Sequence, residues 1–416
     1  MNYSKTASKI RGKLKEFSGN LCNGLSKPIQ RFVGEMVYGI TARQSVLLSE
    51  VVRSLDEDIP EIKTENRLSA QLKRADLGAH VRSAVVREGG GRVGKDTLII
   101  LDISDIAKKH ATSMEYLARV HDGSAHEIAN GYWTVNVVAT ELRGKRIAPL
   151  YGELYSQKSP DFISENHELI TTIAVVSEAV DRRGIWVMDR GGDRHLLFDP
   201  MLDDGLRFLT RARGDRHLVC NRKTRSALDL AQNCPMLFSE TVMRERHGKP
   251  VPVKVEFGAR RVRLPWREEE LWLVVVQGFG KEPMMLMTNV ELTKSRKALW
   301  RMVESYITRW EIEETIRYVK QSYGLENVRV RGYQALRNMF CFLLAVVCFA
   351  TTWLGSFARL GILAHHAITA AKRFFGKPEF MYYAIADGIG ELLRRHGKYD
   401  NYQIPQSGTP LQLALL

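Results

Sequence analysis

Cysteine is scarce in this chain: five cysteines are scattered over 416 residues, and no two of them form a Cys-x-x-Cys pair. An odd number without paired spacing argues against a disulfide framework and against a zinc cluster. The first 17 residues carry charge throughout and lack the apolar core of a secretory signal. These absences predict a protein of the reducing cytoplasm.

Long apolar runs are also missing, with one exception at residues 338–358. These 21 residues carry no charge, and the run is long enough for a membrane span. Polar residues interrupt it, however, and its strictly apolar part covers only residues 339–350. We therefore predict a buried core helix and no membrane partner.

Positive charge, in contrast, is abundant. There are 61 lysines and arginines against 47 acidic residues, which gives a formal net charge of +14. Such an excess predicts a polyanionic partner, with nucleic acid favoured over an anionic membrane surface. Because 44% of the residues are hydrophobic, the chain can bury real cores. Its length indicates about two to four structural units and excludes a single small binding module.

The N-terminal part is predicted to be helical and basic. Residues 1–31 carry seven lysines and arginines against one acid, as expected of an arm that contacts a nucleic-acid backbone. Apolar residues at helical spacing over residues 27–55 predict two helices with a tight turn at residues 39–41, where Thr41 is a plausible N-cap. A plain helical hairpin and a helix-turn-helix both fit this pattern. The glycine-rich residues 89–94 predict a flexible linker that ends this region.

The chain then changes to a mixed pattern. Residues 97–101 form a compact apolar run, which predicts a strand ending at Asp102, and residues 184–188 predict another strand that ends at Asp189. Two further strands and an amphipathic helix are predicted between them, at residues 132–140, 146–155 and 165–180. This order of elements predicts an α/β core.

The following part is rich in β-strand patterns and in positive charge. From Gly205 to Arg263 there are fourteen basic residues against five acidic ones, and the short apolar runs predict strands without a long helix. Helical patterns return over residues 292–323 and 339–354. The predicted organisation is a helical DNA-binding region, an α/β core in two parts, a β-rich insertion between those parts and a helical C-terminal region. These units cover residues 1–90, 91–205 with 293–345, 206–292 and 346–416, respectively.

Asp102 and Asp189 are candidate site residues because each follows a buried strand, where an α/β sheet presents chemistry to solvent. A carboxylate at such a place is costly to leave unpaired, so it should cap a helix, pair with a cation or bind a metal. Two such aspartates in one chain favour a shared site. Asp105 could compete with Asp102 as the first ligand, and we prefer Asp102 because it directly terminates the predicted strand.

A helix face supplies four further candidates. Tyr306, Arg309, Glu313 and Lys320 lie at offsets of 0, 3, 7 and 14, which places them on one side of a continuous helix. Arg309 and Glu313 are also an i, i+4 pair, so a solvated, ion-paired face is the alternative. A cationic stripe around one acid would suit a site that handles phosphate.

The spacing Tyr-x2-Arg-x3-Glu-x6-Lys at these four residues resembles the YREK signature of DDE transposases of the insertion-sequence-four family. The segments Leu-Asp-Ile-Ser-Asp at residues 101–105 and Val-Met-Asp-Arg-Gly at residues 187–191 are similar to the family's first and second catalytic aspartate motifs. The resemblance covers about residues 90 to 340 and includes a β-rich insertion before the glutamate.

This resemblance implies a ribonuclease H-like core and an enzyme that cleaves and transfers DNA. Two Mg2+ ions, for which Mn2+ can substitute, would act on the nucleophile and on the leaving oxygen, and such hard cations prefer oxygen ligands. By the same resemblance the catalytic, metal-holding residues are Asp102, Asp189 and Glu313, and the DNA-phosphate contacts are Tyr306, Arg309 and Lys320.

The resemblance also implies the partners. The protein would bind double-stranded DNA at the terminal inverted repeats of its own element and at target DNA, as a homodimer in a synaptic complex on the bacterial nucleoid. The insertion would contact the transposon end, where Trp266 and Trp272 are candidates to stack on a flipped base, or else are buried strand residues. Two alternatives stay open: a DNA-binding relic without a working site, and a two-metal nuclease without strand transfer.

Overall fold

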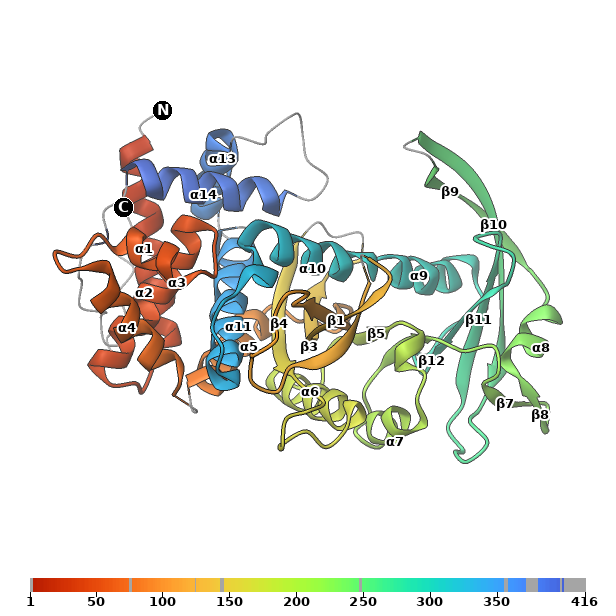
Figure 1. Cartoon of the computed structure of the whole chain (residues 1–416). Coiled ribbons are helices and arrows are strands. Elements are labelled where there is room, and N and C mark those ends of the chain that lie inside the picture. Colours follow the sequence, from red (N-terminus) through yellow and green to blue (C-terminus); the bar gives the residue numbers. More distant parts are fainter. Residues whose placement is uncertain are drawn as a thin grey trace.

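The chain folds into an elongated molecule in which a helical part, a central sheet and a β-rich extension follow one another (Figure 1). The computed structural model describes residues 3–74, 77–123, 125–142, 146–246, 249–354, 358–371, 381–396 and 399. Part of the C-terminal region expected at residues 346–416 therefore lies outside the described residues.

Five helices precede the sheet: α1 (Tyr3–Leu21), α2 (Lys27–Arg43), α3 (Leu48–Leu55), α4 (Glu61–Leu72) and α5 (Leu77–Gly90). The turn predicted at residues 39–41 is wrong, because α2 runs through it and the Thr41 hydroxyl donates to the Val37 carbonyl at 2.6 Å. A Cβ at Gly39 would lie 2.5 Å from Val51 Cγ1, so the glycine lets α3 approach α2 closely. The chain turns only at Gln44, which is left-handed.

Helix α1 occupies the place of the predicted basic arm. Its apolar side is fully buried at Ile10, Leu14 and Phe17, and the Phe17 ring lies 5.4 Å from the Trp353 ring. Its lysines are exposed or half-buried, so they belong to a docked helix and not to an extended arm. Helix α3 presents one exposed cation, Arg53, which already pairs with Glu50. A helical hairpin therefore fits α2 and α3 better than a helix-turn-helix with a basic reading helix.

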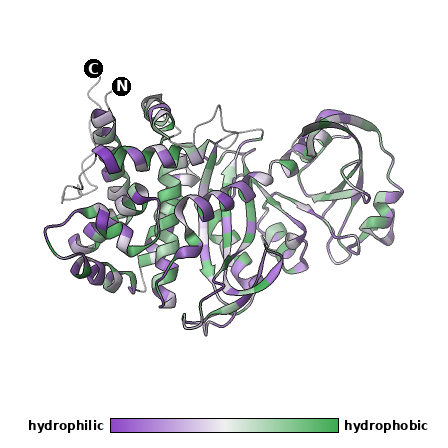
Figure 2. Cartoon of the chain, turned by 45° about the horizontal axis from the view of Figure 1, so that its top comes forward, coloured by the Kyte–Doolittle hydropathy of each residue, from purple (hydrophilic) through white to green (hydrophobic). Residues whose placement is uncertain are grey.

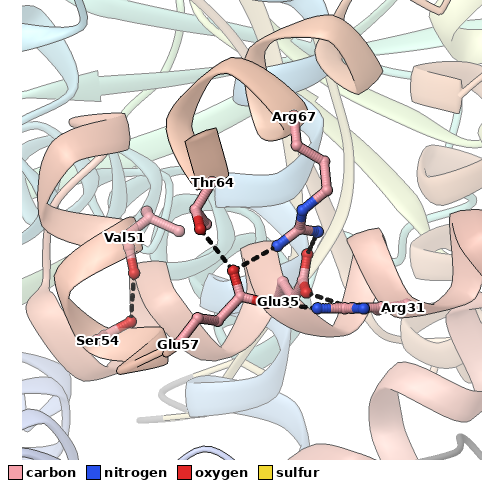
Figure 3. A network of polar contacts seen from close by, with 7 residues as sticks. All are labelled: Arg31, Glu35, Val51, Ser54, Glu57, Thr64 and Arg67. Atoms are coloured by element: carbon pink, nitrogen blue, oxygen red, sulfur yellow. Dashed lines mark hydrogen bonds and ion pairs between the residues drawn. The ribbon is translucent and has the colours of Figure 1, made fainter. Parts of the chain in front are cut away.

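A buried ion network ties these helices together (Figure 3). Glu35 of α2 is fully buried, and its two oxygens accept from Arg31 Nε at 2.7 Å and from Arg67 Nη1 at 2.5 Å. Arg67 of α4 also binds Glu57 at 2.8 Å, and Thr64 donates to the same carboxylate. Because a buried charge is costly unless it is paired, this network fixes α4 against α2.

A ten-stranded mixed sheet forms the centre of the molecule. β1 (Leu98–Ala107) pairs antiparallel with β3 (Glu127–Thr140) and parallel with β5 (Ile185–Met188). β6 (Phe208–Arg211) continues the parallel direction beyond β5, and β4 (Ile147–Tyr155) and β2 (Ala118–Asp122) both pair with β3. The prediction of a mixed α/β class is confirmed.

The β-rich segment extends the same sheet. β12 (Met284–Thr288) pairs with β6 and is followed by β11 (Leu271–Gln277), β10 (Lys249–Val262) and β9 (Phe238–Arg246). β7 (His217–Cys220) and β8 (Lys223–Ser226) form a separate two-stranded sheet beside the short helix α8 (Ala227–Gln232). The described part of residues 206–292 therefore has strands and no long helix, as predicted, but β9 and β10, with 9 and 14 residues, are not short.

Helices cover both faces of the central strands. Ile99 and Leu101 of β1 face one core together with α6 (Glu165–Ala179) and α7 (His195–Asp203). Leu98 and Ile100 alternate with them and face a second core, with α9 (Arg296–Ile307) and α10 (Trp310–Tyr323). The two faces thus receive different helices.

The continuous helix predicted over residues 292–323 is interrupted between α9 and α10. Thr308 donates both its backbone N–H and its hydroxyl to the Glu304 carbonyl, each at 2.8 Å. The Arg309 N–H bonds to the Tyr306 carbonyl, only three residues back. A hydroxyl that competes for a helical carbonyl, followed by such tightened bonds, ends α9 here.

Helix α11 (Tyr333–Cys348) continues into a π-helical segment, Phe349–Trp353, and lies between the N-terminal helices and the sheet. This stretch is the one described helix that is long and apolar enough to cross a membrane, and 89% of its most apolar window is buried. The predicted buried core helix is thus confirmed. Figure 2 shows the apolar residues gathered in the sheet and the interior. The last described helices are α13 (Ala358–Ala370) and α14 (Tyr382–His396).

The flexible linker predicted at residues 89–94 is wrong at its start, because Gly89 and Gly90 are the buried last residues of α5. A Cβ at Gly89 would lie 2.7 Å from the Pro149 carbonyl oxygen of β4, and one at Gly90 would lie 3.2 Å from the Ala179 carbonyl oxygen. These glycines allow the end of α5 to pack directly on the backbone of β4 and α6.

We expect Gly89→Ala to lower the free energy of unfolding by about 1–3 kcal/mol, the usual cost of an overpacked contact. Gly12→Ala is the matched control, because Gly12 lies inside α1 and a Cβ there would meet nothing within 4 Å. It should stabilise the protein by about 0.5–1 kcal/mol, since alanine favours a helix over glycine. Urea unfolding of both variants measures the difference, and equal effects would contradict the close packing of Gly89.

Candidate functional site

Two aspartates lie side by side on adjacent parallel strands. The pairing of β1 with β5 matches Ile100 with Val187, and two more residues along both strands lead to Asp102 and Asp189. Both aspartates have the strand parity that faces α9 and α10. The structure therefore brings together the first two residues of the predicted site.

The surroundings of Asp102 differ from the prediction in one respect. The strand does not end there: β1 continues to Ala107, because Asp102 and the residues after it pair with β3, where Asn136 is opposite Asp102. Only the parallel pairing with β5 stops before Asp102. The carboxylate therefore projects at the point where one neighbouring strand ends, which opens space beside it.

Asp189 follows β5 directly, as predicted. Its carboxylate caps the short 3-10 helix Arg190–Gly192, with Oδ1 accepting from the Gly191 N–H at 2.7 Å. The Thr210 hydroxyl of β6 donates to the Asp189 carbonyl oxygen at 3.1 Å. The helix-capping role and a shared site are thus compatible, since the cap fixes the carboxylate at the end of the strand.

The electrostatics of Asp102 show which charges surround it. Burial raises the pKa of Asp102 to about 7, and the negative charges of Asp189 and Glu313 act in the same direction against the positive charge of Arg309. Three carboxylates and one guanidinium thus lie within electrostatic reach of one another. The acid form of Asp102 is stabilised because burial and the two neighbouring carboxylates outweigh the positive charge of Arg309.

Arg309 and Glu313 meet as the i, i+4 spacing predicts. Arg309 is only 8% exposed, and its Nη2 donates to Glu313 Oε1 at 2.6 Å. Burial by itself would lower the pKa of Arg309, but Glu313, Tyr306 and Asp102 raise it. Its guanidinium carbon lies 5.8 Å from the centre of the buried Tyr306 ring. Arg309 Nε has no hydrogen-bond partner among the described residues.

Lys320 does not join this cluster in the structure. Its ammonium lies 3.4 Å from Asp105 Oδ2 and 3.3 Å from Glu326 Oε1. The predicted stripe is therefore split: Tyr306, Arg309 and Glu313 are together, whereas Lys320, further along α10, pairs with Asp105 of β1 and with Glu326 beyond the helix. Because Asp105 is occupied by Lys320, the geometry favours Asp102 as the partner of Asp189.

The donor set fits a hard divalent cation by its chemistry. Asp102, Asp189 and Glu313 offer carboxylate oxygens. Burial, and after it the neighbouring acids, raise the pKa of Asp102, and a bound cation would oppose both effects. As placed, no three His, Cys, Asp or Glu side chains among the described residues are grouped closely enough to hold a metal ion. Glu313 is held by Arg309 instead.

Two pockets flank the Asp189 loop. One, of about 250 Å³, is lined by Asp102, Asp189, Trp133 and the start of α6. The other, of about 440 Å³, lies on the far side of the short helix. Its lining is rich in cations and comprises Asn166, Arg190, Gly191, Asp193, Arg194, His195, Leu196, Arg213 and Arg216.

Arg194 lies beside the candidate site, and the sequence analysis did not single it out. Its Nε donates to the Gly191 carbonyl at 2.5 Å, its Nη1 donates to Asn166 Oδ1 at 2.9 Å, and its Nη2 pairs with Glu165. It thereby clamps the loop after Asp189 to the first turn of α6. Spacing could not reveal this contact, because Glu165 and Arg194 are distant in the sequence.

The two tryptophans singled out from the sequence have different surroundings. Trp272 is 4% exposed in β11, under the guanidinium of Arg261 at 4.0 Å, so the buried-strand alternative holds for it. Trp266 is 44% exposed, with its indole N–H on Asp199 and its ring 6.2 Å from His195. Trp310, at the start of α10, is 61% exposed and was not among the predicted residues.

Comparison with known proteins gives one family match. Residues 165–349 match the family described as "Transposase DDE domain", and this match supports a DDE transposase. The matched segment contains Asp189 and Glu313 and begins after Asp102. A solved piggyBac transposase synaptic complex with hairpin DNA is similar over 87% of this chain and 72% of that chain, at 9% identity and a TM-score of 0.42. So distant a similarity carries no argument about function. No curated protein matches the chain.

We expect Arg194→Met to speed amide hydrogen exchange in residues 190–193 by about tenfold, because the loop loses charged hydrogen bonds worth about 1.5 kcal/mol or more. Arg183→Met is the control, since Arg183 pairs with the exposed Asp181 beyond the other end of α6. Exchange mass spectrometry distinguishes the two variants. Faster exchange across the whole sheet in Arg194→Met would indicate a general loss of stability and not a clamp.

Proposed function

We propose that this protein is a DDE transposase of the insertion-sequence-four family, which cleaves DNA at the ends of its element and joins those ends to target DNA. One observation carries the proposal: Asp102 and Asp189 lie at neighbouring positions of parallel strands, within electrostatic reach of Glu313 and Arg309. The family match over residues 165–349 supports the same class. The mixed sheet with helices on both faces is in keeping with a ribonuclease H-like core.

The three carboxylates would hold the metal ions in this proposal. Asp102 and Asp189 are the shared ligands, and Glu313 completes the set from α10. Two Mg2+ ions, with Mn2+ as a substitute, supply an activated nucleophile and charge stabilisation at the leaving oxygen. The protein's own contribution is to place these carboxylates on rigid strands and to keep Asp189 fixed through the Gly191 N–H and the Arg194 clamp.

The cations around the carboxylates would position the DNA backbone. Arg309 keeps Glu313 in place through Nη2, and its buried Nε has no hydrogen-bond partner among the described residues. In this proposal the guanidinium would turn toward the DNA and donate to a phosphate oxygen. Tyr306 lies under Arg309 and would contact the phosphate next to the cleaved bond. Arg190 and Arg213 line the pocket beyond Asp189 and extend the positive surface there.

The larger assignments follow from the same proposal. The regions 1–90, 91–205, 206–292, 293–345 and 346–416 would be the helical DNA-binding region, the first part of the core, the insertion, the second part of the core and the C-terminal region. A homodimer would hold two terminal inverted repeats in a synaptic complex, in the bacterial cytoplasm. In this setting the exposed Trp266 is the better candidate of the two tryptophans for stacking on a flipped base.

Substitution of the carboxylates tests the catalytic assignment. We expect Asp102→Asn, Asp189→Asn and Glu313→Gln each to reduce cleavage of the terminal DNA of its own locus by about a thousandfold or more, because metal ligation is worth several kcal/mol. DNA binding should persist, since phosphate contacts remain.

Glu314→Gln is the matched control for Glu313→Gln, because Glu314 is the next residue of α10 and pairs outward with Arg317. It should cleave normally. Cleavage by one of the three carboxylate variants at the control rate would remove that residue from the site. Specific binding without cleavage by the unmodified protein, in Mg2+ and in Mn2+, would favour the DNA-binding relic. Cleavage without joined products would favour a two-metal nuclease.

Lys320→Ala tests whether Lys320 contacts a phosphate or only Asp105 and Glu326. If it contacts a phosphate, the slope of log affinity against log salt concentration should fall by about one unit. The exposed Lys297 of α9 provides the control variant Lys297→Ala. An unchanged slope together with a lower melting temperature would assign Lys320 a structural role at Asp105.

A further inference from the structure

The β7–β8 hairpin has an unusual residue at its tip. Its two turn residues, Asn221 and Arg222, both have positive φ, 51° and 62°. Such a two-residue turn favours Asn followed by Gly, because both positions are left-handed. Arg222 stands where glycine is favoured, and a long side chain there is strained. The chain thus keeps a guanidinium at the tip at a conformational cost.

Strand β8 is not a core element. Lys223, Thr224 and Arg225 are all exposed, and β8 pairs only with β7. Arg225 lies 3.5 Å from Asp229, whereas Arg222 and Lys223 have no ion pair within the described part of the chain. The hairpin therefore presents positive charge to solvent, and two of its cations, Arg222 and Lys223, are not paired within the described residues.

The base of the hairpin is fixed, in contrast to its tip. Leu218 and Cys220 of β7 are buried, and Val219 and Arg263 exchange two backbone hydrogen bonds of 2.9 and 3.0 Å. Arg216, directly before β7, binds Asp193 Oδ1 at 2.7 Å, and Arg216 also lines the pocket beyond Asp189. The hairpin thus projects from the wall of that pocket as a rigid element. Figure 1 places it at the end of the molecule opposite the N-terminal helices.

Protection of a free edge strand is the simpler explanation to consider. Charges on edge strands prevent pairing between molecules, and Lys223 and Arg225 would serve that purpose. Edge protection does not require a charge in the turn, however, and a glycine at position 222 would relieve the backbone there. The guanidinium at the tip therefore calls for a role of its own.

We propose that the β7–β8 hairpin enters the major groove of the double-stranded DNA on which the protein acts, with Arg222 at the base edges and Lys223 and Arg225 at the phosphates on either side. The major groove is wide enough for a two-stranded β-ribbon, and arginine pairs with the O6 and N7 atoms of guanine. The side chains of β8 are exposed on both faces of the strand, so they can reach the two phosphate backbones that border the groove. The proposal rests on the proposed function, because that function supplies the DNA.

Arg222→Gly tests the hairpin without harming its fold, because glycine suits the turn better than arginine. The thermal midpoint should stay the same or rise. Affinity for the terminal DNA of the locus should fall about 5- to 100-fold, as for the loss of one bidentate base contact, with a smaller loss on unrelated duplex DNA of equal length. Lys223→Ala should instead reduce the salt slope by about one unit on both DNAs.

The control is Lys281→Ala, since Lys281 is an exposed lysine without an ion pair in the described loop between β11 and β12 of the same extension. It should leave both affinities unchanged. Methylation protection of guanine N7 locates the hairpin: one or more guanines should be protected by the unmodified protein and become reactive in Arg222→Gly.

Unchanged specific affinity in Arg222→Gly would overturn the proposal, as would equal losses in Arg222→Gly and Lys281→Ala, which would indicate diffuse charge. Guanine N7 atoms that stay reactive throughout would exclude the major groove. These outcomes leave the proposed function intact as long as the unmodified protein cleaves the DNA. If the unmodified protein binds no DNA at all, the proposed function itself fails.

Discussion

The parallel pairing of β1 with β5 is the constraint on which the site depends. It sets Asp102 beside Asp189 on strands whose backbones cannot move apart without breaking the centre of the sheet. Two neighbouring acids repel each other, and the burial that raises the pKa of Asp102 adds to that cost. Arg309 offsets only part of the negative charge. A bound cation would reduce this repulsion, so the arrangement favours cation binding.

The cations around the acids have different partners. Arg309 is buried and faces Glu313, Arg194 holds the loop after Asp189 from the opposite face, and Lys320 is bound to Asp105. Arg309 and Lys320 are carried by the two ends of α10, and Arg194 directly precedes α7. The acids are thus held from both faces of the sheet, while Arg190 and Arg213 line the open pocket beyond Asp189.

The elements that could be predicted from sequence are those with a local cause. Apolar runs predict β5 and the first half of β1, and the acid directly after each run predicts the candidate site, because these signals lie in adjacent residues. The break between α9 and α10 depends on the Thr308 hydroxyl, which periodicity does not register. The turn predicted at Gly39 and the linker predicted at Gly89 are wrong because glycine suits both a tight turn and a close contact between two elements. Only the residue on the other side of the contact shows which of the two applies. Arg194 needed Glu165 from a distant part of the chain.

Helix α11 has a consequence for how this protein can be divided. Its apolar side chains, such as Phe340 and Phe342, share one buried cluster with Leu14 of α1 and with Tyr132 of β3. The boundary between the helical part and the sheet therefore runs through a common hydrophobic interior and not through a linker. The helical part and the sheet therefore cannot be recombined freely with those of other proteins. A replacement for either part would need a surface that fits α11.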